Sequence, residues 1–260
     1  MTMHEEDHPK QPLVAHLIEL RRRLFWCVGL FIVAFGACYH FADYIYDFLA
    51  QPLVEALNGA QRRFIYTSLT EAFVTYMKVA SWGALCITFP FILIQIWKFI
   101  APGLYRHERN ALRPFLVLTP TLFVTGAVFA YFVVIPIAWK FFIGFEQAAM
   151  PGTLPIQLEA RMADYLNLTM SLLFAFGVAF QLPVLMLILV RFGILAPEDL
   201  AKKRRMAILI IFIVAAVLTP PDILSQFCLA LPLMLLYEGG IIAAKIMYPK
   251  KTETEEQADL

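Results

Sequence analysis

Six long apolar runs divide the chain, and charges or prolines bound each of them. Four runs have 18 or more residues, enough at about 1.5 Å per residue to cross a hydrocarbon core of about 30 Å. The last two runs are shorter, and the proline-containing turn 219–222 separates them. The pattern predicts an all-α integral membrane protein with six transmembrane helices: Leu24–Phe41, Val79–Trp97, Phe115–Trp139, Leu166–Val190, Met206–Leu218 and Ile223–Tyr237, the last with an extension to Ala244.

Several prolines fall inside these runs instead of in the connections. A proline in a spanning helix frees a carbonyl and kinks the helix, and neighbouring helices can satisfy that carbonyl. We therefore expect curved helices around a concave face. The prolines concerned are Pro90, Pro120, Pro136, Pro183 and Pro232.

Composition supports a membrane protein and excludes a soluble domain. Hydrophobic residues make up 60% of the chain and charged residues 16%, against about a quarter charged in soluble proteins. Mean hydropathy is +0.70. The four cysteines form no CxxC pair, so they predict neither a zinc site nor a redox motif.

Lysine and arginine are distributed unevenly, and this distribution predicts the orientation. With the N-terminus in the cytoplasm, 16 of the 21 basic residues lie on the cytoplasmic side. We expect a multi-pass protein of the cell inner (cytoplasmic) membrane with both termini cytoplasmic. The predicted divisions are a cytoplasmic segment 1–23, a membrane domain 24–248 and a disordered tail 249–260.

Catalytic motifs in the sequence give little support for an enzyme. Residues 4–8 match the H-E-x-x-H zinc signature, but they lie at the start of the chain and Pro9 follows directly. The phosphate-binding G-x-x-x-x-G-K-[ST] loop and the G-x-S-x-G motif are absent from the sequence. We expect no enzymatic activity, no metal, no cofactor and no nucleic-acid partner.

Polar side chains at membrane depth or at its rim are the remaining candidates, because such groups are costly unless they are paired or functional. Glu19 lies beside Arg21–Arg23, and Glu108 lies between Arg106 and Arg109. A local salt bridge and a binding role are both open for these two acids. The other candidates are Gln95, Tyr131, Gln181, Asp222, Gln226 and Glu238, of which Gln181 and Glu238 are expected to lie deepest.

Several motifs together resemble the TatC family, the receptor subunits of the twin-arginine protein translocase. Residues 16–24 (HLIELRRRL) are similar to its amino-terminal motif, and residues 95–109 to its first cytoplasmic loop. Further matching segments are 129–132, 176–180, 197–204 and 218–222. The resemblance extends from about Pro12 to about Tyr248, with the same number of spans.

The resemblance implies a function. TatC proteins recognise signal peptides that carry two consecutive arginines and, with TatA and TatB, pass folded proteins across the membrane using the proton-motive force. Glu19 and Glu108 match the family's signal-binding acids, and Phe99 matches a signal-binding aromatic. Arg21 is carried over as a neighbour that orients Glu19. Carboxylates suit this role because arginine pairs with them bidentately.

One departure from the family pattern lies in the fourth span. Many members have Glu within a Phe-x-Leu-Pro motif, where this chain has Gln181. The resemblance implies that a single-span TatA- or TatB-type helix docks there. A hydrogen bond from Gln181 to another helix of the same chain, or to a carbonyl freed by Pro183, is the alternative.

The fifth span is short: Met206–Leu218 has 13 residues, or about 20 Å of helix. We expect the bilayer to thin around it, which would aid transport.

A secondary transporter of a small solute is the alternative function, with Glu238 and Gln181 as ligands at the bilayer midplane. It would be favoured by inverted repeats, and the sequence shows none. The expected partners are TatA- and TatB-type proteins, twin-arginine precursors, other TatC copies and membrane lipid.

Overall fold

A computed structural model describes residues 13–57, 64–100, 113–146, 158–218 and 223–247. The described residues form helices and connecting segments, with one isolated bridge between Ile65 and Arg161. The helices are α1 (Leu13–His40), α2 (Ala42–Ala56), α3 (Glu71–Ile100), α5 (Arg113–Phe129), the π-helix η2 (Ala130–Val134), α6 (Ile135–Ile143), α7 (Met162–Ala179), α8 (Leu182–Arg191), α9 (Pro197–Lys202), α10 (Arg204–Leu218) and α11 (Ile223–Met247).

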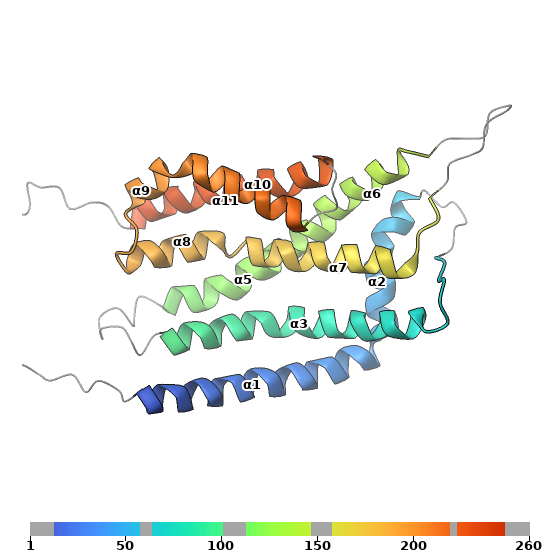
Figure 1. The fold of residues 1–260 in the computed structure, drawn as a ribbon, viewed down its shortest axis with the longest axis horizontal. Helices are drawn as coiled ribbons and strands as arrows, with labels where there is room; N and C mark the ends of the chain where they lie inside the picture. Colours follow the sequence, from blue (N-terminus) through green and yellow to red (C-terminus); the bar gives the residue numbers. More distant parts are fainter. Residues whose placement is uncertain (1–12, 58–63, 101–112, 147–157, 219–222, 248–260) are drawn as a thin grey trace, which may run out of the picture.

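The long helices lie roughly side by side (Figure 1). Within the described residues, five helical stretches are long and apolar enough to cross a membrane: His16–His40, Glu71–Phe99, Phe115–Ile143, Met162–Arg191 and Gln226–Met247. The 15-residue α10 is the sixth and shortest crossing. The start of α1 and the end of α11 lie at the same end of the molecule (Figure 1). The predicted six-span all-α fold is confirmed, and we call this end cytoplasmic.

Helix α1 already begins at Leu13, before the predicted start at Leu24. The predicted boundary at residue 23 therefore falls inside a helix, and the charges of 19–23 lie on its first turns. Helix α3 likewise begins at Glu71, before Val79. The apolar runs mark only the lipid-facing part of each helix, because charged side chains at a helix end extend toward water.

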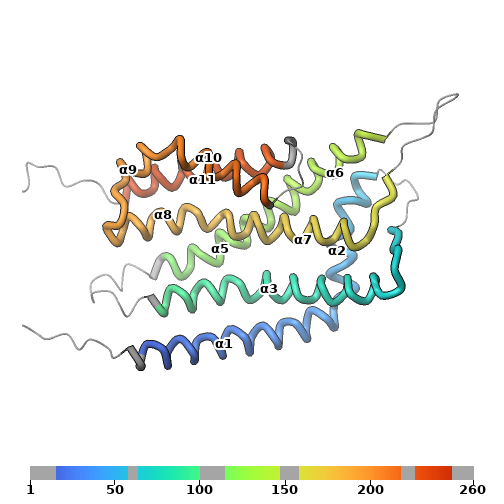
Figure 2. Tube along the Cα trace, in the orientation of Figure 1, coloured from blue at the N-terminus to red at the C-terminus, as the bar shows by residue number. Residues whose placement is uncertain are grey.

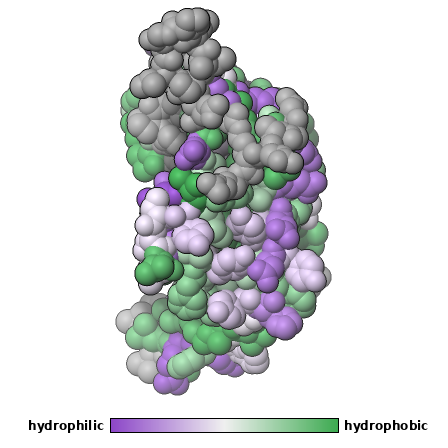
Figure 3. Space-filling model, turned by 90° about the vertical axis from the view of Figure 1, so that its right-hand side faces the viewer, coloured by the Kyte–Doolittle hydropathy of each residue, from purple (hydrophilic) through white to green (hydrophobic). Residues whose placement is uncertain are grey.

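Helix α2 was not predicted. It crosses the other end of the bundle (Figure 2). Its polar positions 43, 47, 51 and 55 recur every four residues and are exposed, while Leu49 and Leu53 are buried. This is an amphipathic period too polar to register as a span. Figure 3 looks at this end, where hydrophilic and apolar residues are interleaved.

The predicted irregularities are present in two spans. The third span passes from α5 through η2 into α6, with Pro136 in the first turn of α6. The fourth breaks at Phe180 and Gln181, and Pro183 lies in the first turn of α8. Pro90, Pro120 and Pro232 lie inside α3, α5 and α11. Kinks are attributable to proline or to a π-turn, so these breaks have local causes.

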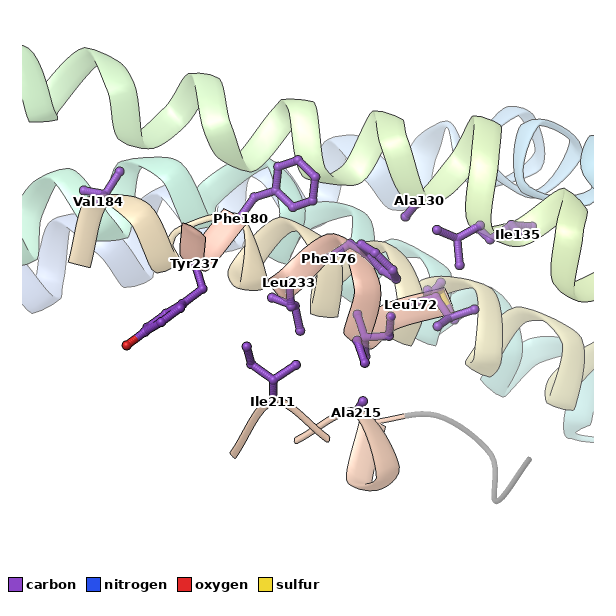
Figure 4. Close-up of a cluster of buried hydrophobic side chains, with 14 of the residues drawn as sticks. Ala130, Ile135, Leu172, Phe176, Phe180, Val184, Ile211, Ala215, Leu233 and Tyr237 are labelled. Carbon is purple, nitrogen blue, oxygen red and sulfur yellow. The ribbon is translucent and has the colours of Figure 1, made fainter. Parts of the chain in front are cut away.

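The core lies where α7 and α8 meet α5, η2, α10 and α11. Phe176 and Ile135 are fully buried, and Leu233 of α11 points toward Ile211 of α10, while Tyr237 points away from it (Figure 4). By contrast, α1 packs mainly against α3 at the edge of the bundle, and only 11% of its most apolar stretch is buried. The cytoplasmic half of this edge pair carries the candidate site.

Candidate functional site

Glu19 lies on α1 with its carboxylate held by Arg23, one helical turn further along. Arg23 Nε donates to Glu19 Oε1 at 3.0 Å, and Arg23 Nη2 donates to the same oxygen. Residues four apart face the same side of a helix. Both side chains are largely covered, with 21% and 18% of their surfaces exposed.

Arg23 also connects α1 to α3. Its Nη1 donates to Gln95 Oε1 at 2.9 Å, and its Nη2 donates to the Lys98 carbonyl oxygen at 3.1 Å. Lys98 lies in the last turn of α3, where carbonyls lack helical partners and attract cations. One guanidinium thus binds a carboxylate, an amide oxygen and a main-chain carbonyl. We call Glu19, Gln95 and the Lys98 carbonyl the guanidinium site.

Phe99 lies next to this site and stacks on His16, with ring centroids 4.1 Å apart and planes at 15°. His16 Nδ1 lies 4.0 Å from Glu19 Oε2. The α1 residues 16, 19 and 23 thus face the end of α3 together.

An apolar cavity of about 380 Å³ opens beside Arg23 between α1 and α3. Gln95 and Arg23 provide its polar edge. Its apolar lining includes Leu24, Cys27, Phe31, Ile92, Ile96 and Phe99. The guanidinium site and the apolar cavity are therefore continuous.

The expectation that Arg21 orients Glu19 is wrong: Arg23 does so. Arg21 and Arg22 lie on another face of α1, in a surface hollow with Phe25 and Trp26. Positions 21 and 19 differ by about 200° around a helix, so Arg21 points away from α3. Two predicted site residues, Glu108 and Asp222, lie outside the described residues.

Gln181 lies at the break between α7 and α8 and reaches α5. Its Nε2 donates to the Thr119 carbonyl at 3.0 Å. Its Oε1 is buried and has no hydrogen-bond partner among the described residues. The contact to α5 is the intramolecular bond given as the alternative. The contact with a partner helix stays a prediction.

Glu238 was expected deep in the membrane, and this is wrong. Its side chain is 44% exposed and pairs with Arg204, the first residue of α10: Arg204 Nε lies 2.8 Å from Oε1 and Nη2 lies 2.9 Å from Oε2. Because α11 continues to Met247, it brings Glu238 beside the cytoplasmic start of α10. Because Glu238 is exposed and paired with Arg204, it does not serve as a ligand at the bilayer midplane.

Tyr131 and Gln226 hold helices together in the described structure. The Tyr131 hydroxyl donates to the Phe48 carbonyl at 2.7 Å, and the two rings stack with centroids 4.3 Å apart. Gln226 Nε2 donates to the Phe212 carbonyl at 3.1 Å, joining α11 to α10.

Sequence reasoning missed an ion pair at the opposite end. Arg161 Nε and Nη2 donate to the two carboxylate oxygens of Glu71 at 2.9 and 3.0 Å. The Thr67 amide adds a bond of 2.8 Å, and Glu71 is only 7% exposed. Hydrogen bonding to this carboxylate raises the pKa of Arg161 above its usual value. The partners are 90 residues apart, so no spacing pattern could have found them.

The fold and the site define a class: a polytopic helical membrane protein whose cytoplasmic rim holds a guanidinium between two helices. The chain belongs to the TatC family, since residues 15–232 match the family described as Sec-independent protein translocase protein (TatC). It is a multi-pass inner-membrane protein.

Relatives and solved structures agree with this assignment. The chain is 47% identical to the Sec-independent protein translocase protein TatC of Rickettsia prowazekii, over 91% of this chain and 94% of that one. It is 40% identical to that of Escherichia coli, over 95% and 93%. A crystal structure of the twin arginine translocase receptor TatC is similar with a TM-score of 0.75 and 35% identity, covering 89% of this chain and 98% of that one.

Proposed function

We propose that this chain is the subunit of a twin-arginine translocase that receives signal peptides at the cytoplasmic ends of α1 and α3. The observation that carries the proposal is the guanidinium site, which holds an arginine side chain by three kinds of acceptor. Arginine stays charged and presents a rigid fork of donors, so such a site binds it better than it binds lysine.

The surroundings fit the rest of a signal peptide. The cavity beside Arg23, between α1 and α3, has an almost wholly apolar lining. An apolar segment that follows the arginines would transfer its side chains there from water, gaining about 25 cal/mol per Å² buried. Phe99 lies between the two regions. The resemblance to the family adds Glu108 as a second acid for the second arginine.

Transport requires partners, for which Gln181 is the proposed contact. Its Oε1 is buried without a hydrogen-bond partner among the described residues, and single-span TatA- or TatB-type helices often carry one polar residue near their start in the family. The proton-motive force drives the movement of folded precursors in this scheme. The proposal assigns the chain binding and transport roles and no catalytic step.

The small-solute transporter is not favoured. Its ligands would have been Gln181 and Glu238, and Glu238 instead lies exposed beside Arg204. The relatives are translocase proteins.

Deleting the protein and complementing it with Glu19→Ala, Glu108→Ala or both tests the proposal. We expect deletion to retain precursors with twin-arginine signals selectively, and each variant to weaken signal-peptide crosslinking and export. Loss of a partly desolvated charge pair costs about 2–5 kcal/mol of binding. Glu198→Ala removes an exposed acid at the start of α9 and serves as the control. Normal export by the double variant would refute the arginine-binding role.

A further inference from the structure

Arg23 differs from Arg21, Arg22 and Arg204, which lie at the same end of the molecule. Arg204 pairs with the side chain of Glu238, its one ion-pair partner among the described residues, and both are about half exposed. Arg21 and Arg22 line an open surface hollow. Arg23 is 18% exposed and donates hydrogen bonds to acceptors on both α1 and α3. Its contacts are those of a bound arginine ligand more than those of a surface salt bridge.

These contacts use the atoms that an incoming arginine needs. Oε1 of Glu19 accepts two hydrogen bonds from Arg23, while Gln95 Oε1 and the Lys98 carbonyl take the other side of the same guanidinium. A foreign guanidinium binds a carboxylate bidentately, so it cannot engage Glu19 fully while Arg23 remains. Arg23 has a long flexible stem at the membrane rim, and its charged end can move to water when it is displaced.

We propose that Arg23 occupies the guanidinium site in cis as an internal competitor, and that the first arginine of a signal peptide takes its place. This inference rests on the proposed function. It adds Gln95 and the Lys98 carbonyl as acceptors for the signal arginine and gives Arg23 a role in setting affinity.

The exchange lowers what the first arginine adds to binding. Because that arginine must displace Arg23, its net contribution to affinity is smaller than it would be at an empty site. The second arginine and the apolar segment in the cavity add to it. A site occupied by its own side chain about nine-tenths of the time binds a ligand about tenfold more weakly than the empty site.

The test uses the purified full-length protein and synthetic signal peptides with Arg-Arg or Lys-Lys pairs. We expect Arg23→Met to bind both peptides about tenfold more tightly than wild type, since removing a competitor raises every affinity by the same factor. Arg23→Lys keeps the charge but lacks the fork, and should bind with intermediate affinity. Arg22→Met removes a charge from the same helix without emptying the site, and should not tighten binding.

Two results would contradict the competitor role or the proposed function. Weakened or unchanged binding in Arg23→Met, with Arg22→Met unchanged, would overturn the competitor role, and a loss as large as in Glu19→Ala would make Arg23 a positioning residue. If Glu19→Ala leaves peptide binding intact, the proposed function fails at this site.

A second measurement judges the inference without any signal peptide. Guanidinium ion should raise the thermal unfolding midpoint of Arg23→Met relative to that of Arg22→Met, because it fills the emptied site. The gain should disappear in the Glu19→Ala/Arg23→Met double variant. Equal responses in Arg23→Met and Arg22→Met would overturn the inference.

Discussion

Arginine–carboxylate pairs occupy different environments along the described chain. Arg204 and Glu238 are exposed, and such pairs contribute about 0–1 kcal/mol because solvent screens them. Glu71 is nearly buried beneath Arg161 and also accepts hydrogen bonds from the amide and hydroxyl of Thr67. The same two residue types therefore form the proposed binding site at one end of the bundle and a structural contact at the other.

The Glu71–Arg161 pair should matter for stability. In Glu71→Leu the arginine loses its partner, and in Arg161→Leu a buried carboxylate is left uncompensated, which is strongly unfavourable. We expect both single variants to lower the thermal unfolding midpoint, and Arg161→Leu to lower it more. Glu159→Gln, an exposed neighbour, is the control. A double Leu variant less stable than both single variants would contradict the pairing argument.

For single residues, the sequence predicted which side chains are polar candidates better than it predicted what they contact. Glu19 was identified as a charged residue at the rim, and it lies in a polar site. Its partner was assigned to Arg21, since adjacency in sequence says nothing about the face of a helix. Glu238 was misplaced because its depth depends on where α11 ends. Gln181 was identified as a polar group in need of a partner, and the structure provides one at Thr119.

Among the elements, α5 and α7 approach closely through glycine. A Cβ at Gly126 would lie 2.5 Å from the Phe176 carbonyl oxygen, and one at Gly177 would lie 2.6 Å from the Phe123 ring. The backbone oxygen cannot move away as a side chain could. This contact fixes α7 against α5 just before the break at Phe180.

Gly126→Ala should therefore force the two helices apart. Overpacking of this kind costs about 1–3 kcal/mol, and we expect a lower unfolding midpoint. Gly29→Ala is the matched control, because nothing lies within 4 Å of the position where its Cβ would be. Equal midpoints for the two variants would show that α5 and α7 adjust without cost.

Helix α10 has 15 residues, which span about 22 Å and fall short of a core of about 30 Å. Inserting six apolar residues, about 9 Å of helix, should remove the mismatch and reduce transport while signal-peptide binding stays intact. Adding six residues to the tail 249–260 controls for length. Unchanged transport would exclude bilayer thinning at α10 from the mechanism.

The spans could be predicted because apolar length is a local property of the sequence. Their ends could not, because 13–23 and 71–78 are helical yet carry polar residues. Helix α2 was missed for a related reason: its regular polar stripe lowers its hydropathy, and only packing shows that its other face is buried. The π-turn η2 gave no signal, since Pro136 alone does not specify one.

At the scale of the assembly, Gln181 provides the test of partner docking. Val178 and Leu185 lie on either side of it and are 38% and 48% exposed. Cysteines at these positions should crosslink to a TatA- or TatB-type helix in the membrane, and Gln181→Leu should weaken the crosslinks without unfolding the protein. Interhelical hydrogen bonds in membranes are worth about 0.6 kcal/mol on average, so a severalfold loss is expected. Val184→Cys, 1% exposed, is the negative control.

The outcomes of this experiment separate the two contacts of Gln181. Crosslinks that form only within the chain would leave the bond to Thr119 as its whole role. Gln181→Glu restores the residue common in the family. It should keep the partner crosslinks if the partner helix recognises hydrogen bonding and not charge.

The edge position of the α1–α3 pair has a consequence for how the protein is made. Every described contact of the guanidinium site lies between residues 16 and 99, in the first part of the chain to leave the ribosome. The deep core of α7, α8, α10 and α11 follows later in synthesis. A nascent chain thus carries all the residues of the guanidinium site, and Arg23 with them, before it carries most of the bundle.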